Sequence, residues 1–454
     1  MVSFQKYPEY LATKYPWIGD VPSSWEVRRL KEVGRLFGGA GFPHEYQNVQ
    51  GEELYFYKVG DLSLSENGKT LLASPHTISK DTAQLLRAII VPKNAIVYAK
   101  IGAALLLNRR RMTTAACCID NNMTAYVVDA EKVVPEWAFY WLSTLDFGEH
   151  VNPGAVPSFS EGYQSVLPIP VPPIEEQKVI ARFLDFKTAQ IDALIAKQQS
   201  LLGKLAEKRT ALISHAVTKG LDPSVAMKDS EVPWLGDIPA HWAPKRMRFC
   251  MKTNPSKGEI KLNDDELVSF IPMEAVGEFG GLNLDAEKEL GEIGGGYTYF
   301  ADSDVVVAKI TPCFENGKGA IARGLKNGIA FGTTELHVMR SDNTLLPDYL
   351  FHLTMSHPFR CIGESEMYGA GGQKRVPETF LKDFRIGLPP VNEQQDIIDY
   401  INKVNQKLDM QMSKATDVID RLTEYRSALI TNAVTGKIDV RSFKIPDAPV
   451  SNAE

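Results

Sequence analysis

The sequence predicts an α+β protein in which two related α/β-mixed globules are separated by two long antiparallel coiled-coil helices. Three observations lead to this fold class. Segments of the chain recur at a fixed offset, two long stretches carry heptad patterns of apolar residues, and the segments between them alternate short strand and helix patterns.

An internal repeat organises the whole chain. Residues 17–25 recur as residues 234–242, residues 169–177 recur as 386–394, and residues 209–218 recur as 426–435. The offset is 217 residues in all three pairs, and three matches in one register indicate duplication. Inner matches are weaker and slip in register, as between residues 97–101 and 306–310, so the two inserts are expected to share a fold but to differ in detail.

The repeat divides the chain into seven segments. They are an N-terminal segment 1–25, a first globule 26–168, a central region 169–220 with a long helix, a repeat of the N-terminal segment 221–242, a second globule 243–385, a C-terminal region 386–436 with the other long helix, and a tail 437–454.

Each long helix is predicted between a pair of prolines and a glycine. The prolines at 172–173 and 389–390 suit the first helical turn, and the glutamates that follow them complement the helix dipole. Gly220 and Gly436 lie where C-terminal caps are expected.

Apolar residues repeat every seven positions along both stretches, which predicts a coiled-coil seam. These positions are Leu184, Ile191, Gln198, Leu205 and Leu212, then Ile401, Leu408, Ala415, Leu422 and Leu429, with Leu194, Leu201, Val404, Val418 and Tyr425 interleaved. A duplicated chain that folds about a two-fold axis pairs its helices antiparallel. The alternative is two separate helical hairpins, each packed on its own globule.

The two inserts mix short strands and helices. Strand patterns cover residues 53–59, 88–91, 95–99, 124–128, 267–271 and 305–308, and helices opened by proline cover 135–145 and 347–355. Each insert is therefore expected to form one α+β globule.

Composition excludes several classes of protein. The 50 Lys+Arg against 56 Asp+Glu give a net charge of −6, which still allows a local nucleic-acid surface. No apolar run approaches the roughly 20 residues of a membrane span, and the N-terminus lacks a signal core, so a soluble cytoplasmic protein is expected. The five cysteines contain no CxxC pair and are expected to be buried thiols.

No catalytic or metal site is predicted. Gly68-Lys69-Thr70 ends like a phosphate-binding loop, but Ser63 stands where the first glycine of that motif would be. His337 lies in a predicted strand, where a packed or surface histidine is more usual than a metal ligand. No Ser/His/Asp or Cys/His set can be assembled, which favours a binding protein.

Two related globules on a rigid pair of helices suit a partner that is read at two places, such as duplex DNA. Arginine can grip phosphate or guanine with two hydrogen bonds, and glutamine can read adenine. The candidate DNA contacts are Arg109, Arg110, Arg111, Gln373, Lys374 and Arg375, with Lys58, Lys100, Lys309, Lys318 and Arg323 as weaker ones. Each could instead be solvated surface charge. Neither globule is basic overall, so partners are expected to supply much of the phosphate grip.

Residues 17–25 and 169–177 with their copies, and residues 211–221, resemble the conserved segments of Type I restriction-modification specificity (S) subunits. The resemblance covers the frame of the entire chain. It implies that the two globules are target recognition domains of a non-catalytic subunit that reads a bipartite, asymmetric double-stranded DNA site. It also implies two methyltransferase (modification) subunits and restriction/translocase subunits as partners in a prokaryotic cytoplasm, at the nucleoid when bound to DNA.

The resemblance further implies that this chain binds no cofactor, and that S-adenosylmethionine, ATP and Mg belong to the partners. The partner-docking candidates lie at the helix ends: Glu176, Gln177, Arg209, Glu393, Gln394 and Arg426. They could equally be capping or seam-flanking residues. The alternative function is a non-catalytic coiled-coil scaffold whose globules bind proteins rather than DNA.

Overall fold

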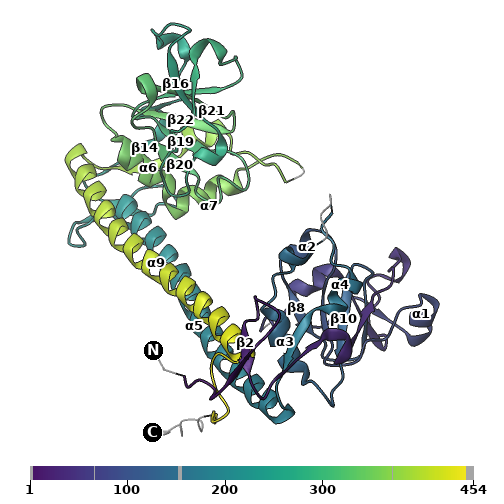
Figure 1. Cartoon of the computed structure of the whole chain (residues 1–454). Helices are drawn as coiled ribbons and strands as arrows, with labels where there is room; N and C mark the ends of the chain where they lie inside the picture. Colours follow the sequence, from purple (N-terminus) through teal and green to yellow (C-terminus); the bar gives the residue numbers. More distant parts are fainter. Residues whose placement is uncertain (1–3, 66, 152–155, 371, 446–454) are drawn as a thin grey trace. The chain divides into compact units, whose positions relative to one another are not determined.

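The computed structural model describes residues 4–65, 67–151, 156–370 and 372–445 (Figure 1). The chain divides into two compact units. The first contains residues 1–199 and 416–454, and the second contains residues 200–415. The long helices α5 (Ile174–Lys219) and α9 (Val391–Val434) each contribute one segment to each unit.

The first globule is built on a four-stranded antiparallel sheet in the order β4-β10-β7-β8. A smaller sheet has the order β6-β5-β9, in which β5 and β9 run parallel. The strands are β4 (Gly34–Gly38), β5 (Leu54–Tyr57), β6 (Thr77–Ile78), β7 (Ile96–Ala99), β8 (Arg110–Met112), β9 (Cys117–Ile119) and β10 (Met123–Val128).

Four short helices accompany these sheets: α1 (Lys80–Leu85), α2 (Ala103–Leu106), α3 (Pro135–Ser143) and α4 (Glu161–Val166). Helix α3 starts at the predicted proline and is almost wholly buried. Its Trp137 and Trp141 donate hydrogen bonds of 3.1 Å to the carbonyl oxygens of Pro170 and Pro168, so the core of the globule is tied to the strand that leads into α5.

The second globule repeats this topology. Its main sheet has the order β15-β22-β19-β20, and its other sheet has the order β17-β16-β21-β18, with β16 and β21 parallel. The elements are β15 (Met251–Thr253), β16 (Leu267–Ile271), β17 (Glu287–Glu289), β18 (Thr298–Ala301), β19 (Val305–Ala308), β20 (Gly319–Ile321), β21 (Ile329–Gly332), β22 (Leu336–Ser341), α6 (Pro347–Met355), α7 (His357–Ser365) and α8 (Glu378–Asp383). The duplication therefore extends to the divergent inserts.

One predicted strand is wrong. Residues 88–91 form only a single bridge, between Val91 and Cys117, where the second globule has the full strand β18 paired with β21. Arg87 precedes this stretch at φ +50°, and Pro92 follows it and lacks an N–H group, so both ends interrupt a ladder. The bridging Val91 is buried, as the apolar pattern suggested.

The frame around the globules keeps the offset of 217 residues strand by strand. Strand pairs β1–β2 and β3–β11 recur as β12–β13 and β14–β23. Their bounds are Tyr10–Ala12, Asp20–Pro22, Glu26–Arg29 and Pro168–Val171, then Met227–Asp229, Asp237–Pro239, Ala243–Arg246 and Arg385–Leu388. Gly220 and Gly436 follow the long helices at φ +75° and +72°, which fits the predicted caps.

The helix segments pair antiparallel in each unit. In the first unit Asp192 of α5 contacts Arg426 of α9, and in the second Arg209 contacts Asp409, so α9 numbers fall as α5 numbers rise. The predicted seam residues Leu184, Ile191, Leu205, Ile401, Leu408, Ala415 and Leu429 are buried. These contacts confirm the antiparallel pair.

The prediction that the interleaved apolar positions belong to the buried seam is wrong. Leu194, Leu201, Val418 and Tyr425 are 41–47% exposed, and Ile195, one position after Leu194, packs on the core instead. A straight helix drifts relative to a 3.5-residue repeat, and a pair of helices can cover only a narrow stripe. The seam is therefore narrower than the heptad pattern predicted.

Candidate nucleic-acid interface

A lysine follows the central strand in both globules, in the same backbone setting. The N–H of Lys100, after β7, donates to Asn122 at 2.8 Å, and its carbonyl accepts from Phe159 at 2.8 Å. Lys309, after β19, donates to Glu335 at 2.9 Å and accepts from Val376 at 2.8 Å. The sheet therefore places two of the sequence-predicted candidates at equivalent positions.

The surroundings of the two lysines differ. Lys100 forms an ion pair of 2.9 Å with Glu161, whereas the Nζ atom of Lys309 has no hydrogen-bond or ion-pair partner within the described part of the chain. Glu378 corresponds to Glu161 at the offset of 217, but it accepts from Thr253 and pairs with Lys382 at 2.8 Å. These contacts lower the pKa of Glu378 and leave Lys309 available.

Lys309 lines a cleft of about 460 Å³ in the second globule. Its walls come from the loop before η6 (Lys257–Glu259), from the start of β18, from β22, and from the hairpin that leads to α8. The lining combines three cations with aromatic and amide groups: Lys257, Lys309, Arg375, Tyr297, Tyr299, Tyr368 and Asn254. This mixture of chemistry is typical of nucleic-acid surfaces.

Tyr368 and Arg375, on either side of the glycine-rich segment, line one edge of this cleft. Tyr368 and Arg375 exchange backbone hydrogen bonds of 3.2 and 2.9 Å. Gln373 and Lys374 are exposed, whereas Arg375 makes two hydrogen bonds of 2.9 and 2.8 Å to Glu335, which lower the pKa of that carboxylate. Gln373 and Lys374 thus remain free to contact a ligand, and Arg375 is held in place as part of the wall.

The basic run at residues 109–111 overlaps the start of β8, so its three side chains differ in exposure. Arg109 is exposed and Arg111 is half-buried, with a hydrogen bond of 2.9 Å to the Gly68 carbonyl. Arg110 is buried, donates to the carbonyls of Asn108 and Leu145, and lies 3.8 Å from the centre of the Phe147 ring. Burial lowers its pKa to about 10. The expectation that Arg110 contacts DNA is therefore corrected, because strand alternation turns it into the core.

The remaining cationic candidates have partners inside their own globule. Lys58 donates to Gln47 at 3.0 Å, Lys318 donates to the Met273 carbonyl at 3.1 Å, and Arg323 pairs with Asp348 at 2.5 Å. Arg323 is exposed and its pair is accessible. All three remain predicted DNA contacts. Their charged groups are already engaged within the described part of the protein, unlike those of Lys309 and Arg109.

Two glutamines predicted as docking residues are structural instead. Gln177 is fully buried, accepts from the N–H of Val134 at 2.8 Å, and donates to the carbonyls of Lys132 at 3.0 Å and Pro172 at 2.8 Å. Gln394 makes the same three contacts with Leu346, Thr344 and Pro389. Each glutamine joins the start of a long helix to the turn before α3 or α6, so neither can dock a partner.

The two glutamates beside them differ from each other. Glu176 is buried and accepts hydrogen bonds from Tyr7 at 2.6 Å and Trp25 at 3.0 Å, so its docking role is also corrected. Its copy Glu393 is partly exposed and lies 2.6 Å from His241. The Nε1 of Trp242, the copy of Trp25, has no partner among the described residues.

The two arginines form a reciprocal pair of contacts. Arg426 donates to Asp192 at 2.8 and 3.2 Å, and Arg209 contacts Asp409. Asp192 and Asp409 are themselves related by the offset of 217. The arginines therefore fix the register of the helix segments within each unit, and their use as docking residues stays a prediction.

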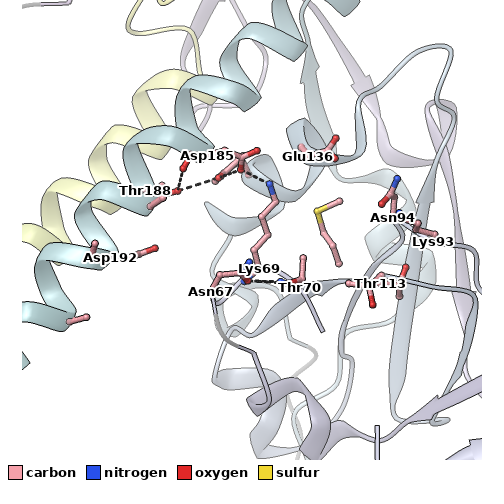
Figure 2. Close-up of a pocket in the computed structure, with 16 residues that line it drawn as sticks. Asn67, Lys69, Thr70, Lys93, Asn94, Thr113, Glu136, Asp185, Thr188 and Asp192 are labelled. Atoms are coloured by element: carbon pink, nitrogen blue, oxygen red, sulfur yellow. Dashed lines mark hydrogen bonds and ion pairs between the residues drawn. The ribbon is translucent and has the colours of Figure 1, made fainter. Parts of the chain in front are cut away.

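A second cleft, of about 710 Å³, lies between the first globule and α5 (Figure 2). Figure 2 shows Lys69 directed at Asp185, which also accepts from Tyr140 at 2.6 Å. Burial and the Asp185 carboxylate raise the pKa of Tyr140. Lys69 thus links the loop that carries it to helix α5.

Sequence reasoning missed most of the cleft around Lys309. Tyr297, Tyr368, Lys257 and His337 lie far apart in the chain and only the fold brings them together. A usable signal was the pairing of residues 97–101 with 306–310, which aligns Lys100 with Lys309.

The described residues offer neither a membrane-spanning helix nor a metal-binding cluster. They contain no helix that is long and apolar enough to cross a membrane. Over the same ranges, no group of three or more His, Cys, Asp or Glu side chains is arranged to hold a metal ion.

The chain matches the Type I restriction modification DNA specificity domain over residues 22–202 and again over 296–419, together more than half of its length. The chain therefore belongs to the family of Type I restriction-modification specificity subunits.

Individual relatives agree with this assignment. The chain is 36% identical over 239 residues to the Type I restriction enzyme EcoEI specificity subunit of Escherichia coli, a match that covers 51% of this chain and 39% of that subunit. It is 22% identical over 465 residues to the putative type I restriction enzyme MjaX specificity subunit of Methanocaldococcus jannaschii, covering 97% and 99%. The chain thus spans less than half the length of EcoEI but almost all of MjaX.

A solved structure has the same fold. It belongs to a study described as the structural basis underlying complex assembly and conformational transition of the type I R-M system. The TM-score is 0.64 at 12% identity, and the match covers 91% of this chain and 98% of the other.

Proposed function

We propose that this chain reads a bipartite, asymmetric DNA site, with one half-site contacted by each globule. The observation that carries the proposal is the pair of globules with one strand order and different surfaces. Lys100 and Lys309 occupy the same backbone position, but Lys100 pairs with Glu161, whereas Lys309 lines a cleft with tyrosines and further cations. One scaffold with two different surfaces suits the reading of two different half-sites.

The long helices are the spacer in this proposal. Both are continuous, and each contributes to both units. Their register is set by the reciprocal contacts of Arg209 and Arg426. A spacer of this kind makes the separation of the half-sites a property of helix length.

The partners complete the assembly. We infer that two methyltransferase subunits and restriction/translocase subunits bind this chain, and that they carry S-adenosylmethionine, ATP and Mg. The naming of the relatives as specificity subunits supports a non-catalytic role for this chain. Arg426 and Glu393 are the docking candidates with partly exposed side chains, whereas the Arg209 side chain is mostly covered.

An insertion tests the spacer. The register in which Asp192 contacts Arg426 places Lys197 opposite Arg421. Seven residues added after Lys197 and seven after Asp420 keep the heptad seam and lengthen the pair by about 10 Å. At about 3.4 Å per base pair, the preferred gap between half-sites should grow by about three base pairs, with both half-site sequences unchanged. A change in the half-site sequences would contradict the division into spacer and reading domains.

A further inference from the structure

The cleft around Lys309 is large enough to hold more of a nucleotide than the exposed edge of a base pair. Its volume is about 460 Å³, within the range of sites that enclose small ligands. An edge contact in a groove of duplex DNA is made by side chains that project from the protein surface, whereas this site is a cleft lined by polar and aromatic side chains. The chemistry of each wall indicates which part of DNA it accepts.

Two tyrosines supply flat apolar surface at the opening of the cleft. Tyr368 is 66% exposed, and Tyr297 is 37% exposed with its ring edge-on to Phe270 at 5.0 Å. Exposed aromatic rings stack on bases that have left the duplex, because every base has a π face. Bases inside a duplex already stack on their neighbours and cannot use such rings.

Cations lie beside the tyrosines. The Nζ of Lys309 has no partner among residues 4–65, 67–151, 156–370 and 372–445, and Lys257 is exposed with its Nζ 5.0 Å from the Phe331 ring centre. The acidic side chains nearby are engaged, Glu335 by Arg375 and Glu378 by Lys382. The cleft therefore keeps a positive surplus that suits the phosphates flanking one nucleotide.

The buried imidazole of His337 lines the cleft. The Nε2 of His337 lies 2.8 Å from the Val376 carbonyl, so it carries the proton, and Nδ1 is left as an acceptor without a partner in the described chain. Burial lowers the pKa of His337, which keeps this tautomer neutral. Nδ1 is itself covered, and a neutral acceptor of this kind would match an exocyclic amine that reaches it, as on adenine or cytosine.

We propose that this cleft holds one extrahelical nucleotide of the half-site read by the second globule, with its base against Tyr297 and Tyr368, its phosphates near Lys257 and Lys309, and an exocyclic amine directed to His337. The inference rests on the proposed function. The first globule differs, because Glu161 pairs with Lys100 there. This ion pair packs against Gly38, where a Cβ atom would lie only 2.7 Å from Glu161 Oε1 and 3.1 Å from Lys100 Nζ.

An abasic scan tests the proposal with the full chain in complex with its methyltransferase subunits. On the selected duplex, the nucleotide opposite each base of the half-site is replaced, one at a time, by an abasic site. This removes the cost of unpairing the extruded base, so one position should bind about ten-fold more tightly. Tyr368→Ala should abolish that gain and weaken binding to intact DNA by about five-fold or more.

The controls separate the possible sources of a gain. Methyltransferases extrude their own target base, so a gain in affinity that persists in Tyr368→Ala belongs to the partner subunit and overturns the proposal. The absence of any gain in affinity overturns it as well. Tyr163→Ala, which truncates an exposed tyrosine of the first globule, should leave the scan unaltered. His337→Phe keeps a buried ring but should reduce the preference for an amine-bearing base at that position. If the complex selects no sequence at all, the proposed function itself fails.

Discussion

Truncation of Gln177 should destabilise the first unit strongly. Gln177→Ala leaves one backbone N–H and two carbonyl groups without their partner in a fully buried position. Each unsatisfied buried group costs about 1–3 kcal/mol, and some carbonyls recover partial contacts, so the expected loss is about 3–5 kcal/mol. Gln394→Ala should cost the second unit a similar amount, because its three contacts are the same.

Hydrogen exchange followed by mass spectrometry under mild urea measures each unit separately, which a single unfolding midpoint cannot do. Peptides of the first globule should lose protection in Gln177→Ala and those of the second in Gln394→Ala. Gln190→Ala, which truncates an exposed glutamine of α5, is the matched control and should change protection by less than about 0.5 kcal/mol. A loss below about 1 kcal/mol in Gln177→Ala would refute the role of the glutamine as a structural join.

Three further outcomes are expected. Leu408→Ala should cost about 2–4 kcal/mol in denaturant unfolding and Val418→Ala less than about 1, because only Leu408 is buried in the seam; equal costs would contradict the narrow seam. Arg109→Ala should lower the salt slope of DNA binding by about one, and Arg110→Ala should instead lower the melting temperature; the reverse pattern would refute the assignment. Burial lowers the pKa of His352 to about 4, so the unfolded chain binds the proton first. His352 should therefore make stability fall as pH drops from about 6.5 to about 4, by at most about 3 kcal/mol, and His352→Gln should remove this share of the pH dependence while the share of His337 remains.

The frame of the molecule could be predicted from sequence because its signals are local and repeated. The offset of 217 residues locates both helix starts, and proline and glycine define the ends of the helices. The frame strands were not predicted as strands, although they recur at the same offset. The seam was only half predicted. A heptad pattern states which residues are apolar, but the number of neighbouring helices decides whether Leu194 and Val418 are covered.

The candidate site was harder to predict because charge and polarity do not reveal exposure. Arg109 and Arg110 are neighbours, yet strand alternation exposes one and buries the other against Phe147. Gln177 looked like a surface residue at a helix start, and only the fold shows the three backbone groups it satisfies. Lys309 could be aligned with Lys100 in the sequence, but its free amino group depends on Glu378 turning to Thr253 and Lys382.

The proposal that one chain reads two different half-sites through two globules of one fold can be tested by random-site selection with the full chain and its methyltransferase subunits. We expect one motif made of two unlike half-sites at a fixed gap. Exchange of residues 243–385 for the corresponding segment of a relative should replace one half-site only. A selection without any motif, or a segment exchange that alters both half-sites, would contradict it.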